Sequence, residues 1–174
     1  MNAPKAAPFE FVITRTLDAP RDLVWKAWTE PDRLTRWFSP KGFTNLTSRV
    51  DLRVGGTFHY GLRMPDGGEM WGKFNYREVV PPERLVYVMH FSDAEGGVTR
   101  HPMAPTWPLK TLCTTTLEAQ GDKTLLTVRA VPFEATEEEI RTFEAGRDSM
   151  KGGWGGTFDQ LEAYLAEAMG EDNK

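Results

Sequence analysis

The sequence predicts an α+β protein in which a curved antiparallel sheet of seven strands packs around one long C-terminal helix. Two short helices follow the first strand. Three observations support this fold: residues 136–169 repeat apolar side chains at three- and four-residue steps, residues 43–131 read as strands joined by turns, and two helix-start signals lie between residues 18 and 31. A helix with one apolar stripe must cover another element, and the strands are the candidate.

Length and composition indicate one globular domain. The 174 residues are 40% hydrophobic and 26% charged, with a net charge of −4 and a pI near 5.5. We expect a single domain over residues 9–169 between a flexible tail, 1–8, and a short tail, 170–174. The acidic balance argues against nucleic acid and anionic membranes as partners. One cysteine and the lack of a signal-peptide or membrane-span pattern favour a cytoplasmic protein.

The first elements are a strand and two short helices. Residues 9–17 alternate apolar and polar side chains, as a half-buried strand does. Asp18 is expected to cap the next helix, with Pro20 in its first turn, and that helix runs to about Trp28. A second helix extends from Pro31 to Trp37 and is ended by residues 38–42.

The middle of the chain reads as six strands. They cover residues 45–53, 57–64, 69–80, 84–93, 109–118 and 123–131, separated by Gly- and Pro-containing turns. Between the fourth and fifth of these, the prolines of residues 94–108 exclude regular pairing. Pairing Leu62 with Gly72, and Val80 with Leu85, places six apolar residues on the face under the long helix: Phe58, Tyr60, Phe74, Tyr76, Met89 and Phe91. The same registers align His59, Asn75 and His90 on the other face.

The long C-terminal helix contains an unusual run of glycines. Thr136 and Glu139 form a capping box at its start. Beyond it, Gly152, Gly153, Gly155 and Gly156 surround Trp154, and each costs about 1 kcal/mol relative to alanine in a helix interior. Either the helix starts or kinks there, with Gly146 as another possible break, or bulk is excluded. Exclusion by close packing is favoured, and exclusion by a cavity is the alternative.

This arrangement predicts a cavity, because a strongly curved sheet cannot contact a straight helix along its whole length. The alternative is that the rings fill the core. Residues 98–108, with Met103 and Trp107, form either a lid over the mouth or an inert surface loop. A small apolar or aromatic molecule would suit such a space. The residues expected to bind it are Trp28, Trp37, Phe38, Phe58, Tyr60, Phe74, Tyr76, Met89, Phe91, Trp107, Met150, Trp154 and Phe158.

Several motifs, in order, resemble a known superfamily. They are Asp18-Ala19-Pro20, Val24-Trp25, Ala27-Trp28-Thr29, Pro31, residues 34–37, 51–56 with Phe58, Gly72, 81–85, 124–127 and 153–161. Over about residues 9–165 the chain resembles the START-like (SRPBCC) superfamily, in the branch named for activators of the heat-shock-protein-90 ATPase. The resemblance implies a helix-grip fold. It implies little about function, because members include lipid and small-molecule binders, polyketide cyclases, resistance proteins and chaperone partners.

No strong catalytic or metal motif is present, so neither a catalytic residue nor a metal or cofactor is predicted. His59 and His90 fall on the outer face, and Cys113 is expected to be a buried, inert thiol. The first interpretation is therefore a small-molecule-binding protein. A cyclase- or dehydratase-like enzyme is the second, with Tyr60, Tyr76 and His101 placed to move a proton. A chaperone-partner or adaptor module is the third.

Overall fold

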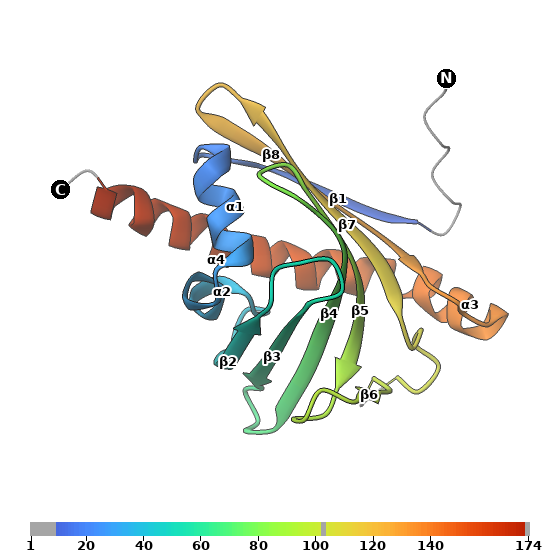
Figure 1. Cartoon of the computed structure of the whole chain (residues 1–174). Helices are drawn as coiled ribbons and strands as arrows, with labels where there is room; N and C mark the ends of the chain where they lie inside the picture. The colour runs from blue at the N-terminus through green and yellow to red at the C-terminus, as the bar shows by residue number, and fades with distance from the viewer. Residues whose placement is uncertain (1–9, 102–103, 173–174) are drawn as a thin grey trace, which may run out of the picture.

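A computed structural model describes residues 10–101 and 104–172, with side chains described through residue 170. One antiparallel sheet curls around a long helix, with two short helices at one end (Figure 1). The elements in chain order are β1 Phe11–Leu17, α1 Arg21–Thr29, α2 Pro31–Trp37, β2 Thr44–Val50, β3 Thr57–Arg63, β4 Glu69–Val80, β5 Arg84–Ser92, β6 Val98–Thr99, β7 Thr111–Gln120, β8 Lys123–Pro132, α3 Glu137–Ala145 and α4 Arg147–Asp172.

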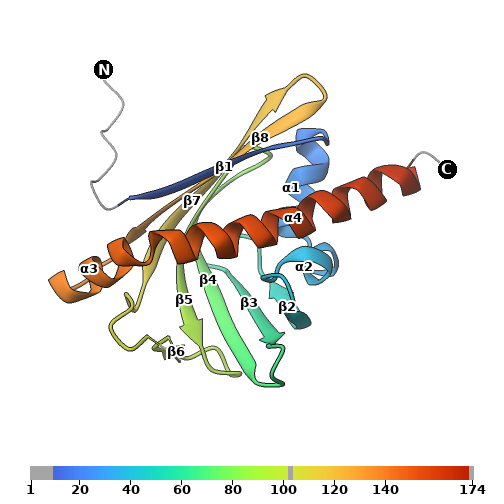
Figure 2. The ribbon, with the colours of Figure 1, turned by 180° about the vertical axis from the view of Figure 1, so that it is seen from behind.

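The sheet confirms the predicted fold class. Its seven long strands run in the order β1-β8-β7-β5-β4-β3-β2. The two-residue β6 pairs with the end of β5 inside a link that the sequence predicted to be irregular throughout. Seen from the opposite side, α4 crosses the concave face from α3 at one end to α1 and α2 at the other (Figure 2).

The start of α1 differs from the prediction. Pro20 is the N-cap residue in extended conformation, and no side chain caps the helix. Asp18 was therefore wrongly predicted as the cap, because it lies two residues before the capping position. The helix still turns Val24 and Trp28 into the core, as expected, and leaves Trp25 partly exposed.

Both predicted hairpin registers are wrong by two residues along most of their length. Tyr60 pairs with Gly72, and Phe74 pairs with Met89. In β4–β5 one residue of the error is present at the turn, where Val80 pairs with Arg84, and a β-bulge between Tyr76 and Glu78 adds the second. A shift of two residues preserves the face on which each side chain lies. The predicted inner face is therefore correct. On the outer face, Lys73 rather than Asn75 lies between His59 and His90.

The C-terminal helical region is two helices. The capping box of Thr136 and Glu139 is confirmed, but α3 ends at Ala145, with Gly146 as its C-cap, and α4 begins at Arg147. An added Cβ atom at Gly146 would lie 2.7 Å from the Trp107 ring, so the break falls where that ring packs. Residues 170–172 of the predicted tail are helical. The flexible tail predicted for 1–8 lies outside the described residues.

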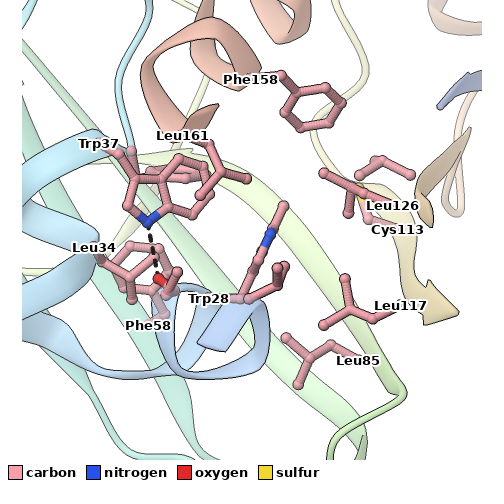
Figure 3. Packing of buried hydrophobic residues seen from close by; sticks show 14 of the residues in the cluster. Trp28, Leu34, Trp37, Phe58, Leu85, Cys113, Leu117, Leu126, Phe158 and Leu161 are labelled. Carbon is pink, nitrogen blue, oxygen red and sulfur yellow. Dashed lines mark hydrogen bonds between the residues drawn. The ribbon is translucent and has the colours of Figure 1, made fainter. Parts of the chain in front are cut away.

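The core fills the end of the molecule near α1 and α2. Figure 3 shows Trp28, Trp37, Phe158 and Leu161 from three helices in one interior with strand residues such as Leu126. The indole N–H of Trp37 donates to the Ala27 carbonyl at 2.9 Å, so the buried ring has its polar group satisfied. No helix among residues 10–101 and 104–172 is long and apolar enough to cross a bilayer.

Candidate ligand-binding cavity

A cavity of about 350 Å³ lies between the concave face of the sheet, the first half of α4 and the link from β6 to β7. Seven of the residues predicted to bind a ligand line it: Phe38, Tyr60, Met89, Phe91, Trp107, Met150 and Trp154. The other six lie in the packed core outside the lining, each at most 2% exposed: Trp28, Trp37, Phe58, Phe74, Tyr76 and Phe158. The cavity and the filled core therefore both exist, at different ends of the same interior.

The four glycines around Trp154 lie in the part of α4 that borders the cavity. Added Cβ atoms at Gly152, Gly153 and Gly155 would meet no heavy atom within 4 Å, and at Gly156 the nearest would be 3.6 Å away. Close packing therefore does not explain this run, and the favoured interpretation of the glycines is wrong. Gly153 lines the cavity, whereas Gly152 does not.

Phe38 joins the cavity to the core. Its ring makes edge contacts with Phe58, Tyr60 and Phe74 at centroid distances of 5.0–5.6 Å, and also contacts Trp154 at 6.4 Å. Two amide side chains hold this segment. Asn45 donates to the Phe38 carbonyl at 3.1 Å, and Gln160 of α4 donates to the Ser39 carbonyl. The connection after α2 is thus fixed to both β2 and α4.

The floor of the cavity comes from neighbouring strands. Tyr60 of β3 lies across its pairing partner Gly72, and a Cβ atom at position 72 would lie 2.2 Å from the Tyr60 hydroxyl oxygen. Only glycine leaves room for the ring there. Beyond Gly72, its β5 partner Phe91 also lines the cavity. Burial raises the pKa of Tyr60, so its phenol stays protonated at neutral pH.

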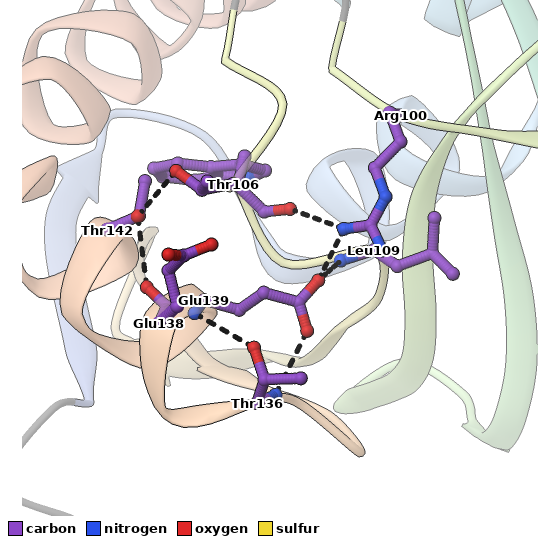
Figure 4. Close-up of polar contacts among 8 residues, drawn as sticks. Arg100, Thr106, Leu109, Thr136, Glu138, Glu139 and Thr142 are labelled. Atoms are coloured by element: carbon purple, nitrogen blue, oxygen red, sulfur yellow. Dashed lines mark hydrogen bonds and ion pairs between the residues drawn. The ribbon is translucent and has the colours of Figure 1, made fainter.

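The described residues of the β6–β7 link, 100–101 and 104–110, form a wall fixed to α3 (Figure 4). The buried Glu139 carboxylate accepts from Arg100 at 2.6 Å and from the Leu109 amide at 3.1 Å, while Thr106 and Thr142 hydroxyls lie 2.8 Å apart. Trp107 packs on Phe143 at 5.4 Å between ring centroids. The described part of this link therefore packs on α3 and lines the cavity. The predicted lid residue Met103 lies outside the described residues.

Titratable groups in the lining are few. Among the described lining residues there is no Asp, Glu, Lys or Arg. His101 lies 4.7 Å from the Phe91 ring, and burial lowers its pKa, which favours the neutral imidazole. Burial also raises the pKa of the Cys113 thiol to about 12, as expected of an unreactive cysteine. In the described part of the chain, no group of three or more His, Cys, Asp or Glu could hold a metal.

Sequence reasoning missed several apolar residues that line the cavity. Leu62 and Met70 are cross-strand partners two residues beyond the Tyr60–Gly72 pair, so they face the same side. The period-2 pattern of β3 could have identified Leu62. Phe143 was part of the helical repeat but was not assigned to the cavity. Pro108 belonged to the predicted lid segment but was not named as a binding residue. Ala130 carried no signal, because only the folded sheet brings it to this end.

Comparisons with known proteins agree with this architecture. A family model described as "Activator of Hsp90 ATPase homolog 1-like protein" matches residues 18–166. A crystal structure of a Nitrosomonas europaea protein shares 26% identity at a TM-score of 0.74, over 95% of this chain and 99% of that one. A solution structure from Arthrobacter aurescens shares 28% identity at a TM-score of 0.74, over 91% and 87%. No curated protein matches the chain.

Proposed function

We propose that this chain, which belongs to the Activator of Hsp90 ATPase homolog 1-like family, binds a small, uncharged, apolar or aromatic molecule in the cavity between its sheet and α4. The observation that carries the proposal is the lining. Aromatic, methionine and aliphatic side chains surround about 350 Å³, a volume within the range of small-molecule sites. The described lining residues include no permanently charged side chain that would favour an ionic ligand.

A second candidate, proton transfer to or from a substrate in the same cavity, rests on Tyr60 and His101 lining it together. No carboxylate among the described residues lines the cavity, and a buried acid was the feature that would favour an enzyme. The adaptor interpretation ranks third, because exposed apolar side chains such as Val12, Leu46 and Val98 lie on separate strands. The single buried cysteine supports a cytoplasmic location for the binding protein.

Binding can be tested by native mass spectrometry of freshly purified protein, followed by thermal unfolding with flavonoids, fatty acids and polyketide-like aromatics. A ligand that binds only the folded chain raises the melting temperature as its concentration rises. Gly153→Phe places a ring at a lining position with free space beside it and should abolish that rise. Gly152→Phe is the matched control, because position 152 has the same free space around an added Cβ atom but lies outside the cavity lining. In this variant the ligand should still raise the melting temperature.

Two results would contradict the proposal. One is the absence of any concentration-dependent rise across the three ligand classes. The other is a rise that survives unchanged in Gly153→Phe, which would place the ligand elsewhere on the molecule.

A further inference from the structure

Three buried tyrosines on the inner face of the sheet differ in what their hydroxyl groups contact. The Tyr87 hydroxyl lies 2.9 Å from Thr115 Oγ1 and is satisfied. The Tyr76 hydroxyl is buried without a hydrogen-bond partner and lies outside the cavity. Tyr60 is 6% exposed, lines the cavity, and makes no hydrogen bond to another residue in the described part of the chain. Tyr60 is thus the tyrosine whose free hydroxyl adjoins the cavity.

The position of that hydroxyl is fixed by the strands. Its oxygen lies over Gly72, whose missing side chain provides the space, and it extends toward β5, where Met89 and Phe91 line the cavity. Phe38 contacts the Tyr60 ring edge-on at 5.0 Å and restricts its rotation. An oriented donor with little freedom to move can recognise an acceptor at small entropic cost.

We infer that the ligand carries an uncharged hydrogen-bond acceptor, such as a ketone or quinone oxygen, which accepts the hydrogen of the Tyr60 hydroxyl inside the cavity. This inference rests on the proposed function. Once a ligand fills the cavity, a hydroxyl left without a partner is unfavourable, so a ligand that pairs with it gains more than one that leaves it unpaired. A carboxylate is excluded from the class, because the described lining residues offer no Lys or Arg to neutralise it.

The test compares two probes of almost equal shape, fluorene and 9-fluorenone, which differ by the carbonyl oxygen. The full chain, Tyr60→Phe and Tyr76→Phe are titrated with each, following tryptophan fluorescence, since Trp107 and Trp154 line the cavity. Each variant removes one hydroxyl and keeps the ring. Tyr60→Phe should weaken fluorenone binding about fivefold relative to its effect on fluorene binding, as loss of one neutral hydrogen bond predicts. Tyr76→Phe should leave the ratio of the two affinities unchanged.

A spectroscopic readout separates the hydrogen bond from packing. The infrared carbonyl stretch of bound fluorenone should move to lower wavenumber in the unmodified chain and in Tyr76→Phe, but not in Tyr60→Phe. Two results would overturn the inference while the proposed function stands. One is that Tyr60→Phe weakens the binding of both probes by the same factor. The other is that the carbonyl stretch of fluorenone bound to Tyr60→Phe has the same lowered wavenumber as in the unmodified chain. If neither probe binds the unmodified chain, the proposed function fails for aromatic molecules of this size, and the inference fails with it.

Discussion

Glu139 has more contacts than a capping residue needs. Its carboxylate accepts from the Thr136 amide at 3.0 Å, which closes the capping box, and also from Arg100 and the Leu109 amide. Hydrogen bonds from Thr136, then Arg100 and Leu109, hold its pKa below the usual range. One side chain therefore starts α3 and fixes the cavity wall to it.

Replacing this carboxylate should weaken the fold in a pH-dependent way. Glu139→Gln should lower the free energy of unfolding by about 1–3 kcal/mol at pH 7, since a charged acceptor shared by three donors is lost. The folded-state pKa is depressed, so this stability is fully present above the unfolded pKa of about 4.3 and is lost as the pH falls through the folded value. Urea unfolding at pH 7 and below pH 4 measures this. The difference in free energy of unfolding between Glu139→Gln and the unmodified chain should be smaller at the lower pH.

Glu138→Gln is the control, because Glu138 is exposed in the same helical turn. It should change the free energy of unfolding by less than about 0.5 kcal/mol. Equal effects of the two substitutions, or a gap that stays constant on acidification, would contradict the role assigned to Glu139.

Residue patterns showed the capping box because its two members lie three positions apart. They could not show that Glu139 also binds Arg100, 39 positions earlier in the chain. The same limit applies to Tyr60. The alternation of apolar and polar residues along its strand predicted that its side chain lies on the inner face of the sheet. Its isolated hydroxyl depends on distances to residues from other strands.

At the scale of an element, α4 contains glycines at positions where neighbouring atoms leave room for a larger side chain. Gly152→Ala should raise the free energy of unfolding by about 0.5–1 kcal/mol, because alanine restricts the unfolded chain and favours helix. Nothing lies within 4 Å of the added Cβ atom. Urea unfolding followed by circular dichroism measures the change.

Gly146→Ala should instead lower the free energy of unfolding in the same measurement. Its Cβ atom would lie 2.7 Å from the Trp107 ring, so the ring must move away from Phe143, at a cost of about 1–3 kcal/mol. Stabilisation by Gly146→Ala, or destabilisation by Gly152→Ala, would show that the glycines have other roles.

Elements themselves were largely predictable, and registers were not. Period-2 alternation placed Phe74 and Tyr76 on the inner face, and an even shift leaves a face unchanged. The β-bulge after Tyr76 has no comparable pattern in the sequence and adds to the error in the β4–β5 partners. The β3–β4 partners were wrong without any bulge. Whether the glycines of α4 lie against neighbouring atoms or beside the cavity depends on the curvature of the sheet. The alternation of apolar and polar residues along the strands does not determine that curvature.

Over the whole molecule, α4 spans two environments. From Phe158 onward it lies on the filled core, where Phe158 and Leu161 are fully buried. Its first half crosses the cavity, where Met150 and Trp154 are partly exposed. The fold can thus keep an empty volume at one end because packing at the other end supplies the stability.

This division predicts unequal effects from similar truncations along one helix. Leu161→Ala should lower the free energy of unfolding by about 2–5 kcal/mol, because it leaves a hole in close-packed surroundings. Met150→Ala enlarges a space that already exists and should cost about 1 kcal/mol or less. Both variants place alanine in the helix, and leucine and methionine have similar helix propensities, so propensity contributes little to the difference. Urea unfolding of the two variants measures it, and equal losses would mean that the interior is filled uniformly and that the cavity does not persist in solution.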